Sequence, residues 1–191
     1  MALKLDMLKA YDRLEWHYLK AVMLKMGISP RFTEMVMRCV SSVTFSVLFN
    51  GGSLHDFRPT RGMRQGDPIS PYLFLLAAEG LSCLLKAQGV GVRGLSVANT
   101  APAINHLLFA DDSLLFFEAN SGSAAQVRDV LRMYCEASGK RINTDKSSIF
   151  FSKGVPEATQ YEIKDVLDVH NELLSEKYLG LPTDVGKNKE G

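Results

Sequence analysis

The stretch INHLLFADDSLLFF, residues 104–117, sets two adjacent carboxylates, Asp111 and Asp112, between two apolar runs. This pattern predicts two β-strands joined by a tight turn. Charged groups beside an apolar core are unfavourable unless something neutralises them. A hairpin turn would lift both carboxylates to the rim of a sheet, where a divalent metal ion could bind them. The alternative reading of this stretch alone is a plain Asp-Asp turn, because Asp favours turns.

A third acid, Asp6, follows the short alternating run Leu3 to Leu5 and precedes a helical pattern. The run predicts a short strand that ends at Asp6. The alternative role for Asp6 is an N-cap, since an Asp side chain accepts from the free N–H groups of a helix. Asp12 is better placed to cap a helix that begins near Arg13, and this leaves Asp6 for other chemistry.

Residues 58–71, RPTRGMRQGDPISP, combine basic side chains with two glycines ahead of an apolar helix. Three arginines fall within seven residues: Arg58, Arg61 and Arg64. Gly62 and Gly66 permit close backbone approach to a ligand. The N-terminal amides of the following helix could face phosphate, and Asp67 would favour the positive end of that helix. The alternative is a solvated turn with incidental charge.

Composition bounds the remaining possibilities. The 191 residues are 46% hydrophobic and 23% charged with a net charge of +1, which is typical of one globular domain and gives no overall field toward nucleic acid. The three cysteines form no CxxC pair, so a reduced intracellular setting fits better than disulfides or a zinc site. The apolar stretch 72–85 is shorter than the ~20 residues of a membrane span, and it predicts a buried helix in a soluble chain. The N-terminus lacks the features of a signal peptide.

Local patterns predict an α+β chain. Apolar spacing predicts a helix ended by Gly27, whose apolar residues are Leu14, Tyr18, Leu19, Val22 and Met26. A second helix starts at Ser29-Pro30 and should bury one face, formed by Phe32, Met35, Val36 and Cys39. The turn signal Asn50-Gly51-Gly52 predicts a hairpin between residues 43 and 57.

Further along, a long apolar helix is predicted from about residue 71 to 86. Ser121 should cap a helix over residues 124–137 that Gly139 ends. A short strand over 149–151, a helix over 156–167 and an extended segment over 178–182 follow, and the tail 187–191 should fray.

Three blocks in this order, LDMLKAYDRLEW (5–16), RGMRQGDPISPYLF (61–74) and FADDSLLF (109–116), resemble motifs A, B and C of reverse transcriptases. SGKRIN (138–143) with Lys146-Ser147, and EKYLGLP (176–182), resemble the next two blocks. The whole set looks like the non-LTR (LINE-type) retrotransposons, particularly those of plants, and covers nearly the entire chain.

The resemblance implies an α+β fold, the reverse-transcriptase palm, with an antiparallel sheet and helices packed on one face. Residues 1–186 would form a partial reverse transcriptase domain, of which residues 14–57 resemble part of the fingers. We expect the chain to be a piece of a longer polyprotein or a decayed genomic copy, with the rest of the fingers, the thumb, an endonuclease and RNase H lying outside it.

The family's reaction is RNA-directed DNA synthesis, in which the primer 3′-hydroxyl attacks the α-phosphate of a dNTP with the help of two metal ions. The resemblance implies Mg²⁺, with Mn²⁺ as a substitute, because hard oxygen ligands suit these ions. Asp6 and Asp111 would bridge the two ions, and the Met7 carbonyl would complete one coordination shell. Asp112 would be the supporting acid.

The same resemblance implies roles around the substrate. Tyr11 would pack under the sugar and exclude a ribose 2′-hydroxyl, and the Lys9 and Ala10 amides would face the triphosphate. Gln65 and Gly66 would shape the nucleotide pocket. The basic side chains expected to contact phosphates of the nucleic acid are Arg58, Arg61 and Arg64. Lys146 is a candidate general acid for the leaving pyrophosphate, and the alternative for it is a surface lysine.

The implied partners are an RNA template, a DNA primer and a dNTP, with no membrane and with the oligomeric state left open. Nuclear localisation follows by analogy with the family. The main alternative function is an inactive retrotransposon remnant that folds and at most binds nucleic acid. Another alternative is a different palm enzyme. The residue types at Ala110 and Tyr11 argue against an RNA-dependent RNA polymerase, and an intron maturase matches less closely overall.

Overall fold

The computed structural model describes residues 1–87, 92, 94–96, 98, 100–172, 177–178 and 181–182. The chain divides into two compact units. The first unit comprises residues 1–6, 87–129 and 142–191, and the second comprises residues 7–86 and 130–141. The predicted frayed tail, residues 187–191, lies outside the described residues. None of the helices in the described part of the chain is long and apolar enough to cross a membrane.

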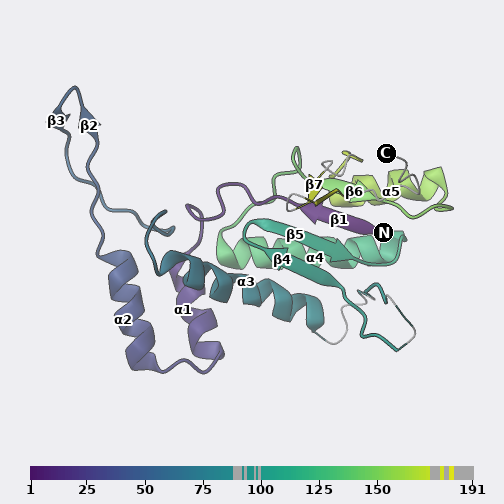
Figure 1. Cartoon of the computed structure of the whole chain (residues 1–191), viewed down its shortest axis with the longest axis horizontal. Helices are drawn as coiled ribbons and strands as arrows, with labels where there is room; N and C mark the ends of the chain where they lie inside the picture. Colours follow the sequence, from purple (N-terminus) through teal and green to yellow (C-terminus); the bar gives the residue numbers. More distant parts are fainter. Residues whose placement is uncertain are drawn as a thin grey trace, which may run out of the picture. The chain divides into compact units, whose positions relative to one another are not determined.

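The first unit is built on a four-stranded antiparallel sheet of order β4–β5–β1–β6 (Figure 1). Its strands are β1 Ala2–Leu5, β4 His106–Phe109, β5 Asp112–Phe116 and β6 Ser148–Phe150. Side chains alternate between the two faces of a strand, and one face is almost fully buried, through Leu3, Leu5, Leu115 and Ile149. The two strands and tight turn predicted around Asp111 and the short strand predicted before Asp6 are therefore confirmed.

Helix α4 Ser121–Ser138 begins in the first unit, which also contains α5 Glu157–Leu167. Asn120 Oδ1, and not Ser121, accepts from the N–H of Ser123 at 2.8 Å. The predicted Ser121 cap is therefore wrong, and the Ser121 hydroxyl instead donates to Glu162 at 2.7 Å. Gly139 ends the helix as predicted, with a left-handed φ of 75°. In the predicted extended segment, β7 Lys177–Tyr178 pairs with β8 Leu181–Pro182.

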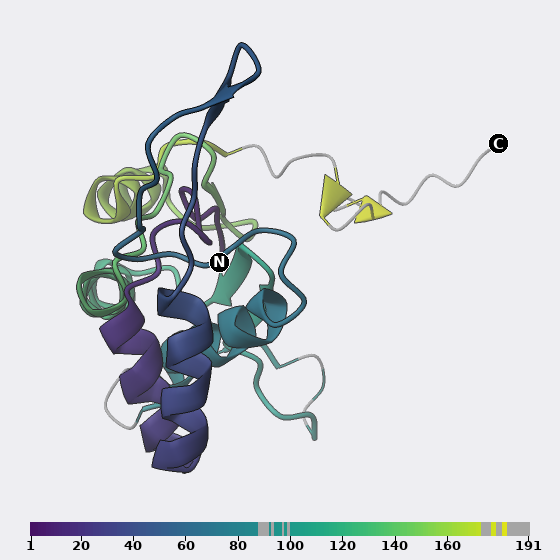
Figure 2. The ribbon, with the colours of Figure 1, turned by 90° about the vertical axis from the view of Figure 1, so that its left-hand side faces the viewer.

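The second unit contains α1 Trp16–Lys25, α2 Pro30–Ser41 and α3 Ser70–Lys86. Helix α1 contacts both α2 and α3, and Figure 2 shows α1 and α2 side by side. Gly27 follows α1 with a φ of 84°, as predicted. The prediction that Asp12 caps this helix is wrong, because α1 begins at Trp16 and its N-cap, Glu15, makes no side-chain capping bond.

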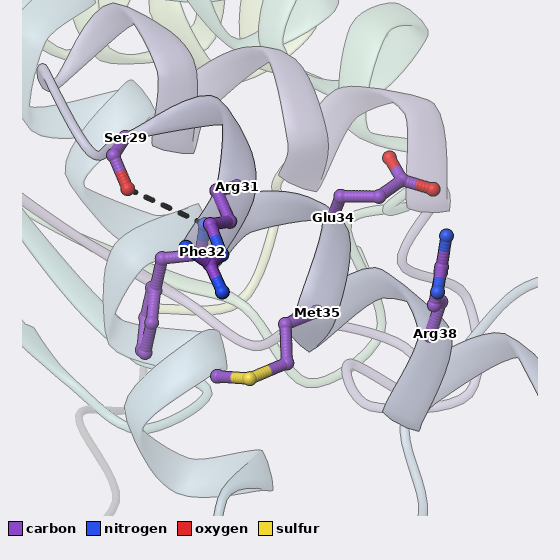
Figure 3. A pocket seen from close by; sticks show the side chains of 6 residues that line it. All are labelled: Ser29, Arg31, Phe32, Glu34, Met35 and Arg38. Atoms are coloured by element: carbon purple, nitrogen blue, oxygen red, sulfur yellow. Dashed lines mark hydrogen bonds between the residues drawn. The ribbon is translucent and has the colours of Figure 1, made fainter.

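The buried face of α2 differs from the predicted one. Val36 is buried as expected, but its buried companions are Thr33 and Met37. Phe32 and Met35 are exposed and line a hollow together with Ser29, Arg31, Glu34 and Arg38 (Figure 3). The helix start was predicted correctly, since the Ser29 hydroxyl accepts from the Phe32 N–H at 3.3 Å.

The predicted hairpin follows α2, with β2 Leu48–Phe49 paired to β3 Gly52–Ser53. Asn50 and Gly51 both have positive φ, 48° and 81°, as a type I′ turn requires. A bridge between Phe45 and Phe57 closes its base. In Figure 2 this hairpin extends away from α1 and α2.

Candidate active site

The β1–β5 ladder brings the first acid to the paired acids. Leu5 stands opposite Ser113, so Asp6 follows directly at the end of β1 while Asp112 precedes Ser113 at the start of β5. Leu5 and Ser113 point into the buried face. Lys4 and Asp112 lie on the other face, where the Lys4 Nζ is 3.9 Å from Asp112 Oδ1. Strand pairing thus joins residues more than 100 positions apart in the sequence.

The β4–β5 turn has only two residues, Ala110 and Asp111, because Phe109 pairs directly with Asp112. Ala110 has a φ of 51°, in the left-handed region that disfavours a Cβ atom by about 1–2 kcal/mol. Such strain persists only where the surrounding structure enforces it, and it is common at functional sites. The turn leaves Asp111 exposed at the rim, while Asp112 is half-buried.

Like charges gather around Asp112. Burial is the main cause that raises the pKa of Asp112, and the negative charges of Asp111 and Asp6 raise it further. The Lys4 ammonium acts in the opposite direction and lowers this pKa without cancelling the rise. Asp6 and Asp111 therefore both act on Asp112 as like charges at this edge of the sheet.

Asp6 is held by a turn that follows α4. Asn143 Nδ2 donates to Asp6 Oδ1 at 3.2 Å. The Asn143 N–H donates to the Asp6 carbonyl at 2.9 Å, and the Asp6 N–H donates to the hydroxyl of buried Ser147 at 3.2 Å. Three hydrogen bonds thus fix both the backbone and the side chain of Asp6.

The carboxylates at this edge of the sheet offer the oxygen ligands that a divalent ion such as Mg²⁺ prefers. In the described part of the chain, no three His, Cys, Asp or Glu side chains form a ready-made metal cage. Mg²⁺ is usually held by one or two carboxylates together with waters and substrate phosphates, so a full protein cage is not required. A bound cation would offset the negative charges that Asp6 and Asp111 present to Asp112.

The second unit carries a backbone turn and a loop that dock on each other. Lys9 has a φ of 47°, and its carbonyl accepts from the N–H groups of Asp12 and Arg13. The Met63 N–H donates to the Tyr11 carbonyl at 2.9 Å, and the Trp16 indole donates to the Gly62 carbonyl at 2.6 Å. A Cβ at Gly62 would lie 2.7 Å from the Asp12 carbonyl oxygen. The predicted close approach at Gly62 is therefore to the protein's own backbone.

This docking brings together residues to which the family resemblance assigns a role at the nucleotide. Tyr11, Gln65 and Gly66 line one hollow together with Asp67, Pro68, Ser70 and Pro71. The Tyr11 ring stacks on Phe74 with ring centroids 4.8 Å apart and planes 12° apart. Asp67 Oδ1 accepts from the Ile69 N–H at 3.0 Å, so Asp67 supports the start of α3 as predicted.

A comparison with protein families decides the identity. The family model described as reverse transcriptase (RNA-dependent DNA polymerase) matches residues 1–183. This chain belongs to the reverse transcriptase family.

The curated relatives of this reverse transcriptase chain include proteins of transposable elements. A retrovirus-related Pol polyprotein from a type-2 retrotransposable element of Drosophila melanogaster is 30% identical over 152 residues, which are 80% of this chain and 14% of the polyprotein. An uncharacterized mitochondrial protein of Arabidopsis thaliana is 53% identical over 73 residues, 36% of this chain and 60% of that protein. The resemblance to LINE-type reverse transcriptases is confirmed. The chain spans less than two thirds of either relative.

Solved structures support the fold. Telomerase from Candida albicans superposes with a TM-score of 0.60 at 18% identity, covering 82% of this chain and 27% of the telomerase. Telomerase from Candida tropicalis gives 0.58 at 17% identity, covering 76% and 25%. The predicted α+β palm architecture is confirmed, and at this identity the likeness concerns the fold alone.

Other residues predicted for the reverse transcriptase site lie as follows. Arg58, Arg61 and Arg64 are exposed, and Arg61 pairs with Glu15 at 3.4 Å. Lys146 is exposed. The Met7 and Ala10 side chains are buried, so their expected roles rest on backbone atoms.

Sequence reasoning missed Lys4 and the contacts of Asn143. Lys4 could have been found, because side chains alternate along a strand and Lys4 stands two residues before Asp6, which directly follows β1. Asn143 lies within a block that resembles the family, but its bond to Asp6 spans 137 positions and has no local signal.

Proposed function

We propose that this chain is the palm, with part of the fingers in residues 14–57, of an RNA-directed DNA polymerase that extends a DNA primer along an RNA template. The observation that carries the proposal is the strand register, in which Leu5 stands opposite Ser113, so that Asp6 follows β1 at the edge of the sheet that carries the Asp111-Asp112 turn. The membership of this chain in the reverse transcriptase family supports the proposal.

In the proposed reaction the primer 3′-hydroxyl loses its proton to water and its oxygen bonds to the α-phosphorus of the dNTP. The bond from that phosphorus to the oxygen that bridges to the β-phosphorus breaks, and pyrophosphate leaves. Two Mg²⁺ ions, which Mn²⁺ can replace, would neutralise charge on the attacking and leaving oxygens. Asp6, Asp111 and the Met7 carbonyl would hold these ions, and Asp112 would support them. Lys146 would donate a proton to the pyrophosphate.

Residues around Tyr11 would contact the nucleotide. Tyr11 would exclude a ribose 2′-hydroxyl, and the stacked Phe74 supports this by restricting the Tyr11 ring. The positive φ of Lys9 turns the chain where its amide and that of Ala10 are proposed to face the triphosphate. Gln65 and Gly66, which share a hollow with Tyr11, would shape the remaining wall. The exposed arginines at 58, 61 and 64 would contact phosphates of the nucleic acid. Action on chromosomal DNA in the nucleus is part of the proposal.

Primer extension separates this function from the alternative of an inactive remnant. The purified chain is incubated with an RNA template, an annealed DNA primer, dNTPs and Mg²⁺, beside the variant Asp111→Asn. We expect extension by the wild-type chain and a loss of at least about a hundredfold, ~2.7 kcal/mol, in the variant. Absence of extension by a folded wild-type chain would favour the remnant, and equal extension by both proteins would remove Asp111 from the mechanism.

A further inference from the structure

We infer that Asn143 is a positioning residue, which fixes the Asp6 carboxylate in the orientation that a divalent cation needs. This inference rests on the proposed function, because it assigns a role to a residue outside the three acids. Asn143 makes two bonds to the same residue, from its side chain to Asp6 Oδ1 at 3.2 Å and from its backbone N–H to the Asp6 carbonyl at 2.9 Å.

The side-chain bond has a direct consequence for metal binding. An ionised carboxylate has about four lone-pair sites, and Asn143 occupies one of them with an amide N–H, which is a charge-assisted bond. The other lone-pair sites would bind the cation, and the bond to Asn143 restricts rotation of the carboxylate before the cation arrives. Partners that orient a metal ligand typically change metal affinity or activity by about 10–100-fold when they are removed.

The turn that carries Asn143 is itself rigidly held. The Asn143 carbonyl accepts from the Ser147 hydroxyl at 2.7 Å and from the Ser147 N–H at 2.9 Å. Asn171 Nδ2 donates to the carbonyls of Asp145 and Ser147 at 2.6 and 3.3 Å. Asn171 therefore braces the same turn through the same kind of amide, without any bond to Asp6 among the described contacts.

This arrangement supplies a matched pair of variants. Asn143→Ala removes the bond to the Asp6 carboxylate, whereas Asn171→Ala removes amide bonds to the turn backbone alone. Asn143→Ser is a second variant, since Ser also suits turns but its hydroxyl is too short to reach Asp6 Oδ1. The readout is Mn²⁺ binding by the full chain, measured as loss of the free-ion signal in electron paramagnetic resonance, with urea midpoints recorded for every variant.

We expect Asn143→Ala and Asn143→Ser to bind Mn²⁺ at least about tenfold more weakly than the wild type. Asn171→Ala should bind Mn²⁺ as tightly as the wild type, even if its urea midpoint falls as much as those of the Asn143 variants. In primer extension, saturating Mn²⁺ should restore most of the rate of the Asn143 variants.

Equal Mn²⁺ affinity in the wild type and both Asn143 variants would overturn the inference, as would an equal loss in Asn171→Ala. The variant Asp111→Asn distinguishes failure of the inference about Asn143 from failure of the proposed function. If Asp111→Asn alone weakens Mn²⁺ binding, the proposed function stands and the role of Asn143 falls. If the wild type binds no Mn²⁺, both fall.

Discussion

The Tyr11 ring lies flat on the Phe74 ring, with centroids 4.8 Å apart and planes 12° apart. The Lys140 ammonium lies 3.8 Å from the centroid of the same Phe74 ring, and Lys140 is buried. Stacking of this kind contributes about 0.5–1.5 kcal/mol beyond area burial. Tyr11 therefore has a defined orientation at the edge of the hollow that it shares with Gln65 and Gly66.

The first prediction concerns this ring. Tyr11→Ala should lower the preference for dNTP over the matching ribonucleotide by at least about tenfold, ~1.4 kcal/mol, because the steric barrier to the 2′-hydroxyl is removed. Tyr11→Phe should keep the preference. The measurement is the ratio of kcat/KM for the two nucleotides in primer extension, and Tyr72→Ala, at an exposed tyrosine of α3, is the control. An unchanged ratio in Tyr11→Ala would show that Tyr11 does not exclude the ribose 2′-hydroxyl.

The second prediction concerns Gly62. Gly62→Ala combines a left-handed φ of 85° with a contact of 2.7 Å to the Asp12 carbonyl oxygen, so it should strongly destabilise the second unit. Gly27→Ala has nearly the same φ, 84°, but nothing within 4 Å, and it should reduce the free energy of unfolding by only about 1–2 kcal/mol. Urea unfolding measures both, and equal losses would show that the Gly62 contact relaxes easily.

The third prediction tests which residue caps α4. Asn120→Ala should reduce the free energy of unfolding by about 1 kcal/mol, because it leaves the Ser123 N–H without its 2.8 Å acceptor. Ser121→Ala removes a hydroxyl whose partner is the exposed Glu162 and should have a smaller effect. Thermal unfolding compares the two variants, and the reverse order would restore Ser121 as the cap.

The fourth prediction is a pH dependence. Burial first, and then the charge of the nearby Cys83, raise the pKa of Tyr18 from its ordinary value of 10.0 to about 12. The folded chain then keeps a proton that the unfolded chain loses. This contribution to stability is complete below pH 10 and disappears as the pH rises toward 12. Tyr18→Phe should flatten that decline in urea titrations between these values, whereas Tyr161→Phe, at an exposed ring, should not.

Local chemistry explains which parts of the fold the sequence could predict. The hairpin at Asn50-Gly51 and the helix end at Gly27 require positive φ, and Asn and Gly are the residue types that favour it. The start of α2 depends on the Ser29 hydroxyl, which accepts from the N–H of Phe32 only three residues away. The meeting of Asp6 with the Asp111 hairpin was expected from the family resemblance, which implies that both acids hold the same metal ions, and the adjacent strands β1 and β5 provide it.

The errors arose where tertiary packing chooses between equivalent local options. The α2 sequence offers more than one apolar stripe, and packing buries Thr33 while leaving Phe32 exposed. Asn120 and Ser121 are both good caps, and only the geometry selects Asn120. The hold of Asn143 on Asp6 depends on a contact 137 positions away, which no local pattern encodes.

The most direct test of the central claim is the position of Mn²⁺ in a crystal structure of the chain, located by anomalous scattering. The account predicts a peak within bonding distance, about 2 Å, of carboxylate oxygens from Asp6 and from the Asp111-Asp112 turn. It would be contradicted by a structure in which the Asp6 oxygens lie farther from the turn than one ion can bridge, with Mn²⁺ bound elsewhere.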